Sequence, residues 1–248
     1  MKRIALLAAA TLLMAGCAAP RPAVDPNIMD KAQAYQQKVQ DKMAADAAAE
    51  EEAKLVRMDF PAGRPLRLMV AGDSLAAGLF ASVQANGFSK VLQAGLGKKG
   101  PVDASGYAKA GATAAQAGAA LQVPSSIDLA VLELGTNDLV QKTDPTVFGG
   151  QYTALLAKVQ RDSPEVQILC LSLWQSPASA ASAYNSIIKD KCGAAGGKYV
   201  DLGGLFVQEA NRGPAGVETW TGQSDAFHPN DTGHKAIADL ILDRIKFS

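Results

Sequence analysis

Short apolar runs alternate with longer stretches of helical spacing along the chain from residue 64 onwards. The runs have the length of buried strands, and they are predicted at 66–71, 102–110, 128–134, 166–173 and 199–202. Helices are predicted at 75–95, directly after Thr113, and at 145–161, 178–192, 203–211 and 231–246. Strands that alternate with helices predict a parallel sheet covered by helices on both faces.

The stretch Leu66–Leu79 is the one around which this domain is organised. Its strand ends at Gly72, and Asp73 and Ser74 are good helix N-cap residues, so a helix is expected to begin there. Ser74 would then lie at the carboxyl edge of the sheet, where open α/β sheets bind their ligands. Taken alone, this Gly-Asp-Ser segment also fits an ordinary turn with a helix cap.

The first 16 residues have the pattern of a signal peptide: a positively charged start, then the apolar run Ile4–Met14. The targeting segment ends in Leu13-Met14-Ala15-Gly16-Cys17, which resembles the lipobox of bacterial lipoproteins. The resemblance implies lipid attachment at Cys17 and a place in the cell envelope; in a Gram-negative cell it implies the outer membrane, facing the periplasm. The alternative is an ordinary secretory signal that is cut nearby.

Residues 17–63 read as a connection between this anchor and the compact domain at 64–248. Three prolines at its start (Pro20, Pro22 and Pro26) predict an extended tether. Residues 28–57 contain neither glycine nor proline and favour a helix, which we interpret as a stalk. A disordered spacer is the alternative interpretation.

The charge balance argues against nucleic acid as a partner, because 24 basic and 24 acidic residues give a net charge of zero. Hydrophobic residues make up 48% of the chain, enough for a sizeable core. Cys170 and Cys192 remain in the mature chain. An envelope location permits a disulfide between them but does not require one.

Four short segments fall at predicted strand ends or in the last loop: Gly72-Asp73-Ser74-Leu75, Gly111, Gly135-Thr136-Asn137-Asp138 and Asp225-Ala226-Phe227-His228-Pro229. Hydrolysis by a serine needs a base, a group that orients the base, and donors for the developing oxyanion. The chain has only two histidines, and Asp225 lies three residues before one of them, His228.

In their order and spacing these segments resemble the SGNH hydrolases, also called the GDSL esterase/lipase family. The resemblance implies a flavodoxin-like three-layer α/β/α sandwich with a parallel five-stranded sheet. It also implies that Ser74 is the nucleophile, His228 the base and Asp225 its orienting group. The oxyanion donors would be the backbone N–H groups of Ser74 and Gly111 and the side-chain amide of Asn137.

Other polar and aromatic residues near these segments have more ordinary interpretations. We expect His234 to be structural, Asp73 to fix its turn and Asp138 to brace its loop. Trp174 and Trp220 are expected at the site edge, where they would either contact substrate or cover loops. The Asp, Asn and His residues could instead hold metals, but the chain lacks an H-x-H or G-D-x-H cluster, so we expect no metal and no cofactor.

The sequence therefore predicts a membrane-tethered serine esterase. Short connections between Gly72, Gly111 and Gly135 leave little room for an apolar lid, so a long acyl chain is not expected. The expected substrate is an O-acetyl ester on an envelope or extracellular polysaccharide. Two alternatives stay open: a lysophospholipase or other lipid esterase, and a non-catalytic envelope binding protein that keeps the fold.

Overall fold

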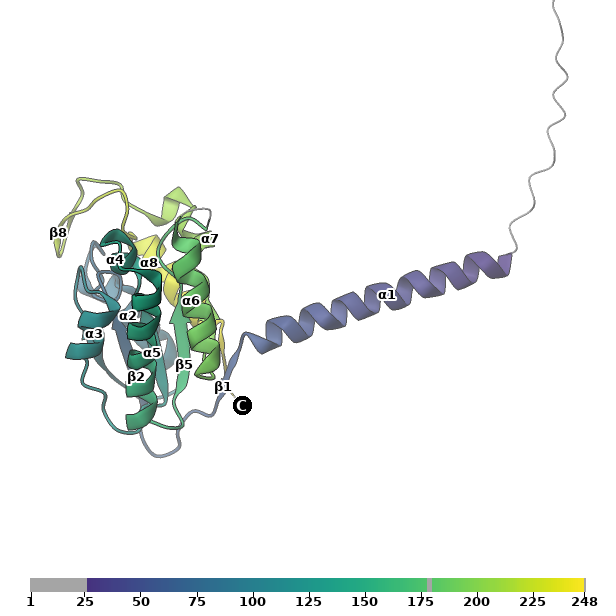
Figure 1. Ribbon diagram of the computed structural model, residues 1–248, viewed down its shortest axis with the longest axis horizontal. Coiled ribbons are helices and arrows are strands. Elements are labelled where there is room, and N and C mark those ends of the chain that lie inside the picture. The colour runs from purple at the N-terminus through teal and green to yellow at the C-terminus, as the bar shows by residue number, and fades with distance from the viewer. Residues whose placement is uncertain (1–25, 178–179, 248) are drawn as a thin grey trace, which may run out of the picture. The chain divides into compact units, whose positions relative to one another are not determined.

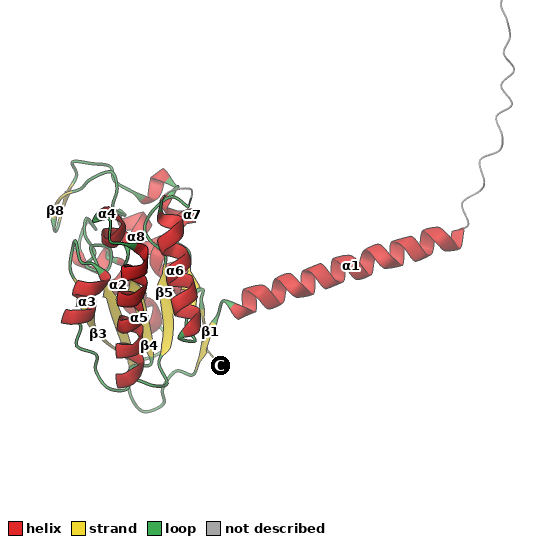
Figure 2. Cartoon of the chain, viewed as in Figure 1, coloured by secondary structure: helices red, strands yellow, loops and turns green. Residues whose placement is uncertain are grey.

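The computed structural model describes residues 26–177 and 180–247 of the chain, and a parallel sheet of five strands lies at its centre (Figure 2). The strands are β2 (Leu66–Gly72), β3 (Val102–Ala108), β4 (Leu129–Glu133), β5 (Gln167–Leu171) and β6 (Lys198–Val200). Their order in the sheet is β3-β2-β4-β5-β6. This is the predicted flavodoxin-like arrangement, and the fold class is confirmed.

Helices cover both faces of the sheet. Residues along β4 therefore alternate between two cores, one on each face. Ala130 and Leu132 pack with α3 (Ala114–Ala120), α5 (Pro145–Asp162) and α6 (Ala181–Ala194). Leu129 and Val131 pack with α2 (Phe88–Gly97) and α8 (Asp231–Leu242) on the other face. Figure 1 shows α3, α5 and α6 in front of the sheet. A strand buried on both faces is apolar throughout, as the sequence pattern requires.

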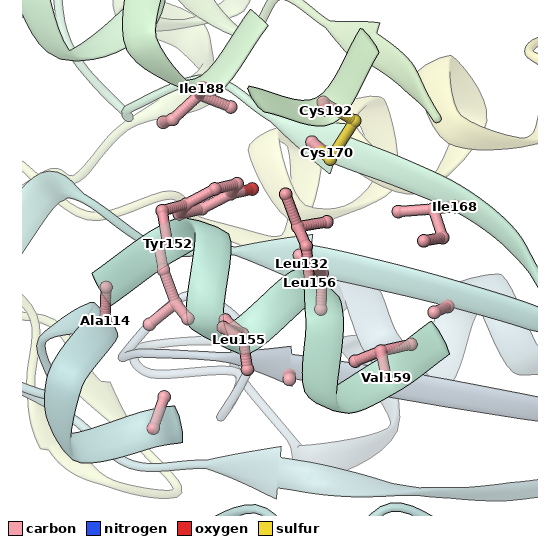
Figure 3. Packing of buried hydrophobic residues seen from close by; sticks show 14 of the residues in the cluster. Ala114, Leu132, Tyr152, Leu155, Leu156, Val159, Ile168, Cys170, Ile188 and Cys192 are labelled. Carbon is pink, nitrogen blue, oxygen red and sulfur yellow. A yellow bond between two sulfur atoms is a disulfide. The ribbon is translucent and has the colours of Figure 1, made fainter. Parts of the chain in front are cut away.

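The core on the α5 side shows how helical spacing builds this face (Figure 3). Tyr152, Leu155, Leu156 and Val159 recur every three or four residues and are all buried. Close by, a disulfide joins Cys170 of β5 to Cys192 of α6, with their Cα atoms 6.2 Å apart. The pairing that the sequence left open is therefore formed in the structure, and it ties a helix to the sheet.

The carboxyl ends of the strands carry the short elements. These are α4 (Thr136–Val140), α7 (Gly203–Phe206), the 3₁₀ turns η1 (Gln84–Asn86) and η2 (Glu209–Asn211), and the hairpin of β7 (Glu218–Thr219) and β8 (Gly222–Gln223). In Figure 1, α4, α7 and β8 are all at the top end of the compact domain. The predicted segment Gly135–Asp138 leads into α4 and therefore lies at this end.

The predicted helix at 75–95 is wrong in its first half. The chain turns after Ser74, with left-handed backbone at Gly78 and Phe80 (φ 73° and 63°), and α2 begins only at Phe88. The backbones of Gly78 and Gly87 approach so closely that a Cβ on Gly87 would lie 2.8 Å from the Gly78 Cα. Side chains distant in sequence, Thr221 and Asp231, accept hydrogen bonds from the N–H groups of Phe80 and Ser82 and replace helical acceptors.

The compact unit begins earlier than the predicted boundary at residue 64, since it extends from Glu50. Its first strand, β1 (Val56–Met58), pairs in parallel with β9 (Ile245–Phe247). Val56 is buried in the core on the α8 side, which explains why this segment belongs to the domain. The closing helix α8 ends at Leu242 and is shorter than the predicted 231–246, since β9 takes up the residues from Ile245.

The helix predicted at 28–57 is present as α1 (Pro26–Ala53), which begins two residues earlier and ends four residues earlier than predicted. Its role as a stalk stays a prediction. Residues 27–49 are all exposed. Within the described part of the chain, no helix combines the length and the hydropathy needed to cross a bilayer. The predicted signal peptide and the lipid-attachment residue Cys17 lie outside the described residues.

Candidate active site

Ser74, His228 and Asp225 form one continuous hydrogen-bonded relay at the carboxyl edge of the sheet. The Nδ1 of His228 lies 2.7 Å from Asp225 Oδ2, and its Nε2 lies 3.0 Å from Ser74 Oγ. A carboxylate only accepts hydrogen bonds, so the ring proton sits on Nδ1 and Nε2 is left to accept the Ser74 hydroxyl proton. The structure thus brings together, across 154 residues of sequence, the three residues predicted to act together.

The loop that carries the acid and the base is folded by Asp225 itself. Its Oδ1 accepts the backbone N–H groups of Phe227 and His228, at 2.9 and 2.8 Å, which is the Asx-turn geometry that aspartate favours. Partial burial raises the pKa of Asp225, but the hydrogen bonds from His228 outweigh it, and the pKa lies below its ordinary value. Asp225 is therefore a carboxylate at neutral pH.

Of the two roles left open for Trp174, the structure agrees with loop cover and not with substrate contact. The side chain is completely buried in the core on the α8 side, and its Nε1 donates to the carbonyl of Phe227 at 2.8 Å. A position at a strand end does not say which way the side chain points. Here the indole lies beneath the loop and holds the residue next to His228.

Two phenylalanines flank the His228 ring and were not identified from the sequence. The rings of Phe80 and Phe227 each make an edge contact with the imidazole, with centroids 5.2 Å away. Phe80 has left-handed backbone, a conformation that costs a non-glycine residue roughly 1 kcal/mol or more and clusters at functional sites. No sequence signal distinguishes Phe80, because its position depends on the turn after Ser74.

The three predicted oxyanion donors differ in their present partners. Among the described residues, the backbone N–H groups of Ser74 and of the exposed Gly111 donate to no acceptor. The Nδ2 of Asn137 donates to Asp73 Oδ2 at 2.8 Å and to the Ala112 carbonyl at 3.1 Å. Both amide hydrogens of Asn137 are thus used. The hydrogen that Asn137 donates to the Ala112 carbonyl must be shared with the oxyanion when it forms.

Asp73 acts as expected, Asp138 contacts the start of α3 and not its own loop, and one further carboxyl group is an addition. Asp73 Oδ1 accepts from Leu75 N–H at 3.1 Å, so Asp73 fixes the turn. The same oxygen lies 3.3 Å from Ser74 Oγ, whose one hydrogen points to His228 in the relay. Asp138 Oδ2 accepts from Ala114 N–H at 3.0 Å and braces the start of α3. The addition is Glu133, a buried carboxyl group at the end of β4 that accepts from Asp73 N–H. A lone acid in the run Leu129–Leu134 was a signal available in the sequence.

Trp220 is accessible, with 43% of its surface exposed, and its Nε1 donates to the Gly78 carbonyl at 3.1 Å. It borders a cavity of about 490 Å³ between the edge strand β3 and the start of α2. A second hollow of about 380 Å³ shares Lys90 and Gln93 with this cavity and continues along α2. The prediction that Trp220 contacts substrate stays a prediction.

His234 lies in the first turn of α8, completely buried, and is not part of the relay. Its Nδ1 accepts from Phe88 N–H at 3.3 Å, so its Nε2 carries the proton and donates to the Leu79 carbonyl at 3.0 Å. It thereby ties both ends of the turn that follows Ser74 to α8. Within the described part of the chain, no three His, Cys, Asp or Glu side chains form a group that could hold a metal ion.

His234 should make the domain sensitive to acid. Burial lowers its pKa from 6.5 to about 4, so the unfolded chain binds the extra proton first as pH falls. Between pH 7 and pH 4 this group should remove about 3 kcal/mol of the free energy of unfolding. Urea unfolding across this range should show a shallower pH dependence in His234→Gln than in wild type. Parallel curves for the two proteins would contradict the buried neutral state.

Comparison with known proteins places this site in a family. Residues 70–236 match the model of the GDSL-like lipase/acylhydrolase family, a span that contains the whole relay. The chain belongs to the GDSL-like lipase/acylhydrolase family. This confirms the predicted resemblance, and it makes the protein a carboxylic ester hydrolase. No curated protein sequence matches the chain significantly.

Solved structures share the fold of this GDSL-like hydrolase at low identity. The psychrotrophic esterase EstA of Pseudoalteromonas sp. has a TM-score of 0.57 and 18% identity, over 72% of this chain and 96% of that one. Phospholipase A1 of Streptomyces albidoflavus has a TM-score of 0.53 and 16% identity, over 73% and 100%.

A third similar structure is a carbohydrate esterase family 2 enzyme with a carbohydrate binding domain, from Corynascus thermopiles (Myceliophthora fergusii). It has a TM-score of 0.53 and 16% identity, over 73% of this chain. The GDSL-like hydrolase spans only 65% of that enzyme. At these identities the likeness concerns the fold.

Proposed function

We propose that Ser74, His228 and Asp225 are the catalytic triad of a serine esterase that removes acetyl or other short acyl groups from a polysaccharide. The observation that carries the catalytic part is the relay, in which Asp225 fixes the imidazole tautomer and Nε2 faces the Ser74 hydroxyl at 3.0 Å. A binding protein that merely keeps the fold has no need of this alignment.

The reaction follows from the direction of these hydrogen bonds. His228 Nε2 takes the hydroxyl proton as Ser74 Oγ attacks the ester carbonyl, and the Asp225 carboxylate stabilises the imidazolium. The N–H groups of Ser74 and Gly111 and the Asn137 amide hold the oxyanion. Collapse expels the alcohol, which His228 protonates. Water then repeats the sequence on the acyl-enzyme, and the acid leaves.

The size of the acyl group is the first substrate question, and the residues after the nucleophile favour a short one. Leu75, which an acyl groove beside Ser74 would use, is completely buried in the core on the α8 side. Leu139 is partly buried and packs against the other core. A long acyl chain therefore cannot use Leu75 and reaches only part of Leu139.

The alcohol part of the substrate is the second question, and the cavity bordered by Trp220 favours a sugar chain. The indole is held by its hydrogen bond to Gly78, four residues after the nucleophile, and presents an apolar ring. The lining beyond it carries amide, hydroxyl and amino groups from Gln84, Ser89, Lys90 and Gln93. Carbohydrate esterases of family 2 and family 3 are among the proteins of similar fold, which supports the same substrate class.

A series of esters tests the substrate proposal. The kcat/KM on p-nitrophenyl esters should fall steeply from acetyl to octanoyl, because each methylene that does not fit loses about 1–3 kcal/mol. O-acetylated oligosaccharides should release acetate. Trp220→Ala should raise KM for these oligosaccharides and leave kcat/KM on p-nitrophenyl acetate unchanged.

Preference for octanoyl esters or lysophospholipids, with no acetate released from the oligosaccharides, would replace the carbohydrate proposal by the lipid esterase. Equal effects of Trp220→Ala on the small and the large substrate would remove Trp220 from the binding of sugar.

We further propose that the enzyme is anchored in the cell envelope through a lipid on Cys17, followed by the Pro-rich tether and α1. The lipobox-like pattern before Cys17 supports this. Cys17→Ser should move the protein from the membrane fraction to the soluble fraction, and mass spectrometry should find acyl chains on the wild-type N-terminus. A soluble wild type without lipid would contradict the anchor.

A further inference from the structure

The end of β4 places a carboxyl group directly beneath the nucleophile turn. Glu133 is completely buried and pairs in register with Gly72, the residue before Asp73. A Cβ on Gly72 would lie 2.7 Å from Glu133 Oε2, so the carboxyl group packs against bare backbone. Its Oε2 accepts the N–H of Asp73 at 3.1 Å. Glu133 is thus tied to the residue directly before Ser74.

The Glu133 and Asp73 carboxyl groups also hydrogen-bond each other. Two carboxylates have no proton to share, so one of the pair must be protonated. Asp73 receives two other donors: Leu75 N–H on Oδ1 and the Asn137 amide on Oδ2. Glu133 Oε1 is buried, and no N–H group or hydroxyl of the described residues donates to it. The donors thus collect on Asp73 and favour its ionised form.

We propose that Glu133 is a neutral carboxylic acid whose hydroxyl donates to the Asp73 carboxylate, and that it is a positioning residue for the oxyanion donor Asn137. Burial and the nearby charge of Asp73 both raise the pKa of Glu133 far above its ordinary value, which agrees with the neutral form. The hydrogen bond from Glu133 fixes the Asp73 carboxylate, and Asp73 Oδ2 in turn orients the Asn137 amide at 2.8 Å.

This inference rests on the proposed function of Ser74 and Asn137, because it assigns Glu133 a part in the same reaction. It goes beyond that function in two respects. One net negative charge, not two, lies under the nucleophile turn. The oxyanion donor is oriented through a chain that begins in the sheet and passes from Glu133 to Asp73 to Asn137.

Glutamine and leucine at position 133 distinguish this role from simple packing. Glutamine reproduces the neutral acid, with one acceptor for Asp73 N–H and one donor for the Asp73 carboxylate, whereas leucine has neither. On p-nitrophenyl acetate, Glu133→Gln should keep kcat within about threefold, while Glu133→Leu should lose about 10- to 100-fold in kcat with little change in KM. Leu129→Ala, at the opposite end of β4, is the control for destabilisation and should leave kcat unchanged.

Infrared difference spectroscopy of wild type against Glu133→Gln at pH 7 supplies a readout independent of activity. It should show the loss of one C=O band of a protonated carboxylic acid, also in a Ser74→Ala background. Equal losses of kcat in the two variants, or no lost band, would overturn the proposal. A wild type without esterase activity would overturn the proposed function instead, while the lost band would still establish the neutral acid.

Discussion

Replacing His228 by alanine should lower kcat on p-nitrophenyl acetate by roughly 10⁴- to 10⁶-fold, the largest effect expected of a single substitution in this protein. His228 is the group that takes the proton from Ser74 Oγ and returns it to the leaving alcohol, and no other imidazole reaches that oxygen. Steady-state kinetics at pH 7 measures the loss, and far-UV circular dichroism checks that the variant is folded.

His234→Gln is the matched control for this substitution. It removes the other histidine of the chain, which is buried against Leu79 and Phe88 and does not touch the relay. This variant should keep most of the activity at pH 7. An active His228→Ala together with an inactive His234→Gln would reverse the assignment of the base.

Asn137→Ala should lower kcat by about 10²- to 10³-fold with little change in KM, because the amide stabilises charge that develops only in the transition state. The size of the effect also depends on the hydrogen that Asn137 now donates to the Ala112 carbonyl at 3.1 Å. Val140→Ala, an exposed position on the same short helix α4, is the control and should change neither constant. An unchanged kcat in Asn137→Ala would remove this amide from the oxyanion site.

The sheet was predictable because each of its central strands is buried on both faces. The runs at Leu66–Ala71 and Asp128–Leu134 must be apolar throughout in such a sheet, and their alternation with helical stretches sets the parallel order. The relay was predictable for a related reason: parallel strands bring their carboxyl ends to one edge, so residues far apart in sequence meet there.

The turn after Ser74 was not predictable, because its hydrogen bonds come from distant residues. The side chains of Thr221 and Asp231 accept hydrogen bonds from the backbone at Phe80 and Ser82. No local sequence pattern predicts either contact. Propensity alone favoured a helix from Leu75, and tertiary contacts outweighed it. The role of Trp174 stayed open and Phe80 was not identified for the same reason, since both depend on how the loops at this edge fold.

Glu133 differs from these cases, because the sequence does carry the signal for it. A charged residue inside a strand buried on both faces is expensive unless it is paired or neutral, and Leu129–Leu134 contains one such residue. That observation points to a special environment at the end of β4. The identity of its partner, Asp73, follows only from the strand register that aligns Glu133 with Gly72.

Covalent labelling tests most directly whether Ser74 is the nucleophile. The protein would be incubated with a fluorophosphonate, which reacts with activated serines, and the adduct would be located by mass spectrometry of peptides. Wild type should carry one adduct, on Ser74, and lose esterase activity in step with labelling, while Ser74→Ala should be neither labelled nor active. Labelling at another serine, or undiminished turnover by Ser74→Ala, would contradict the serine mechanism.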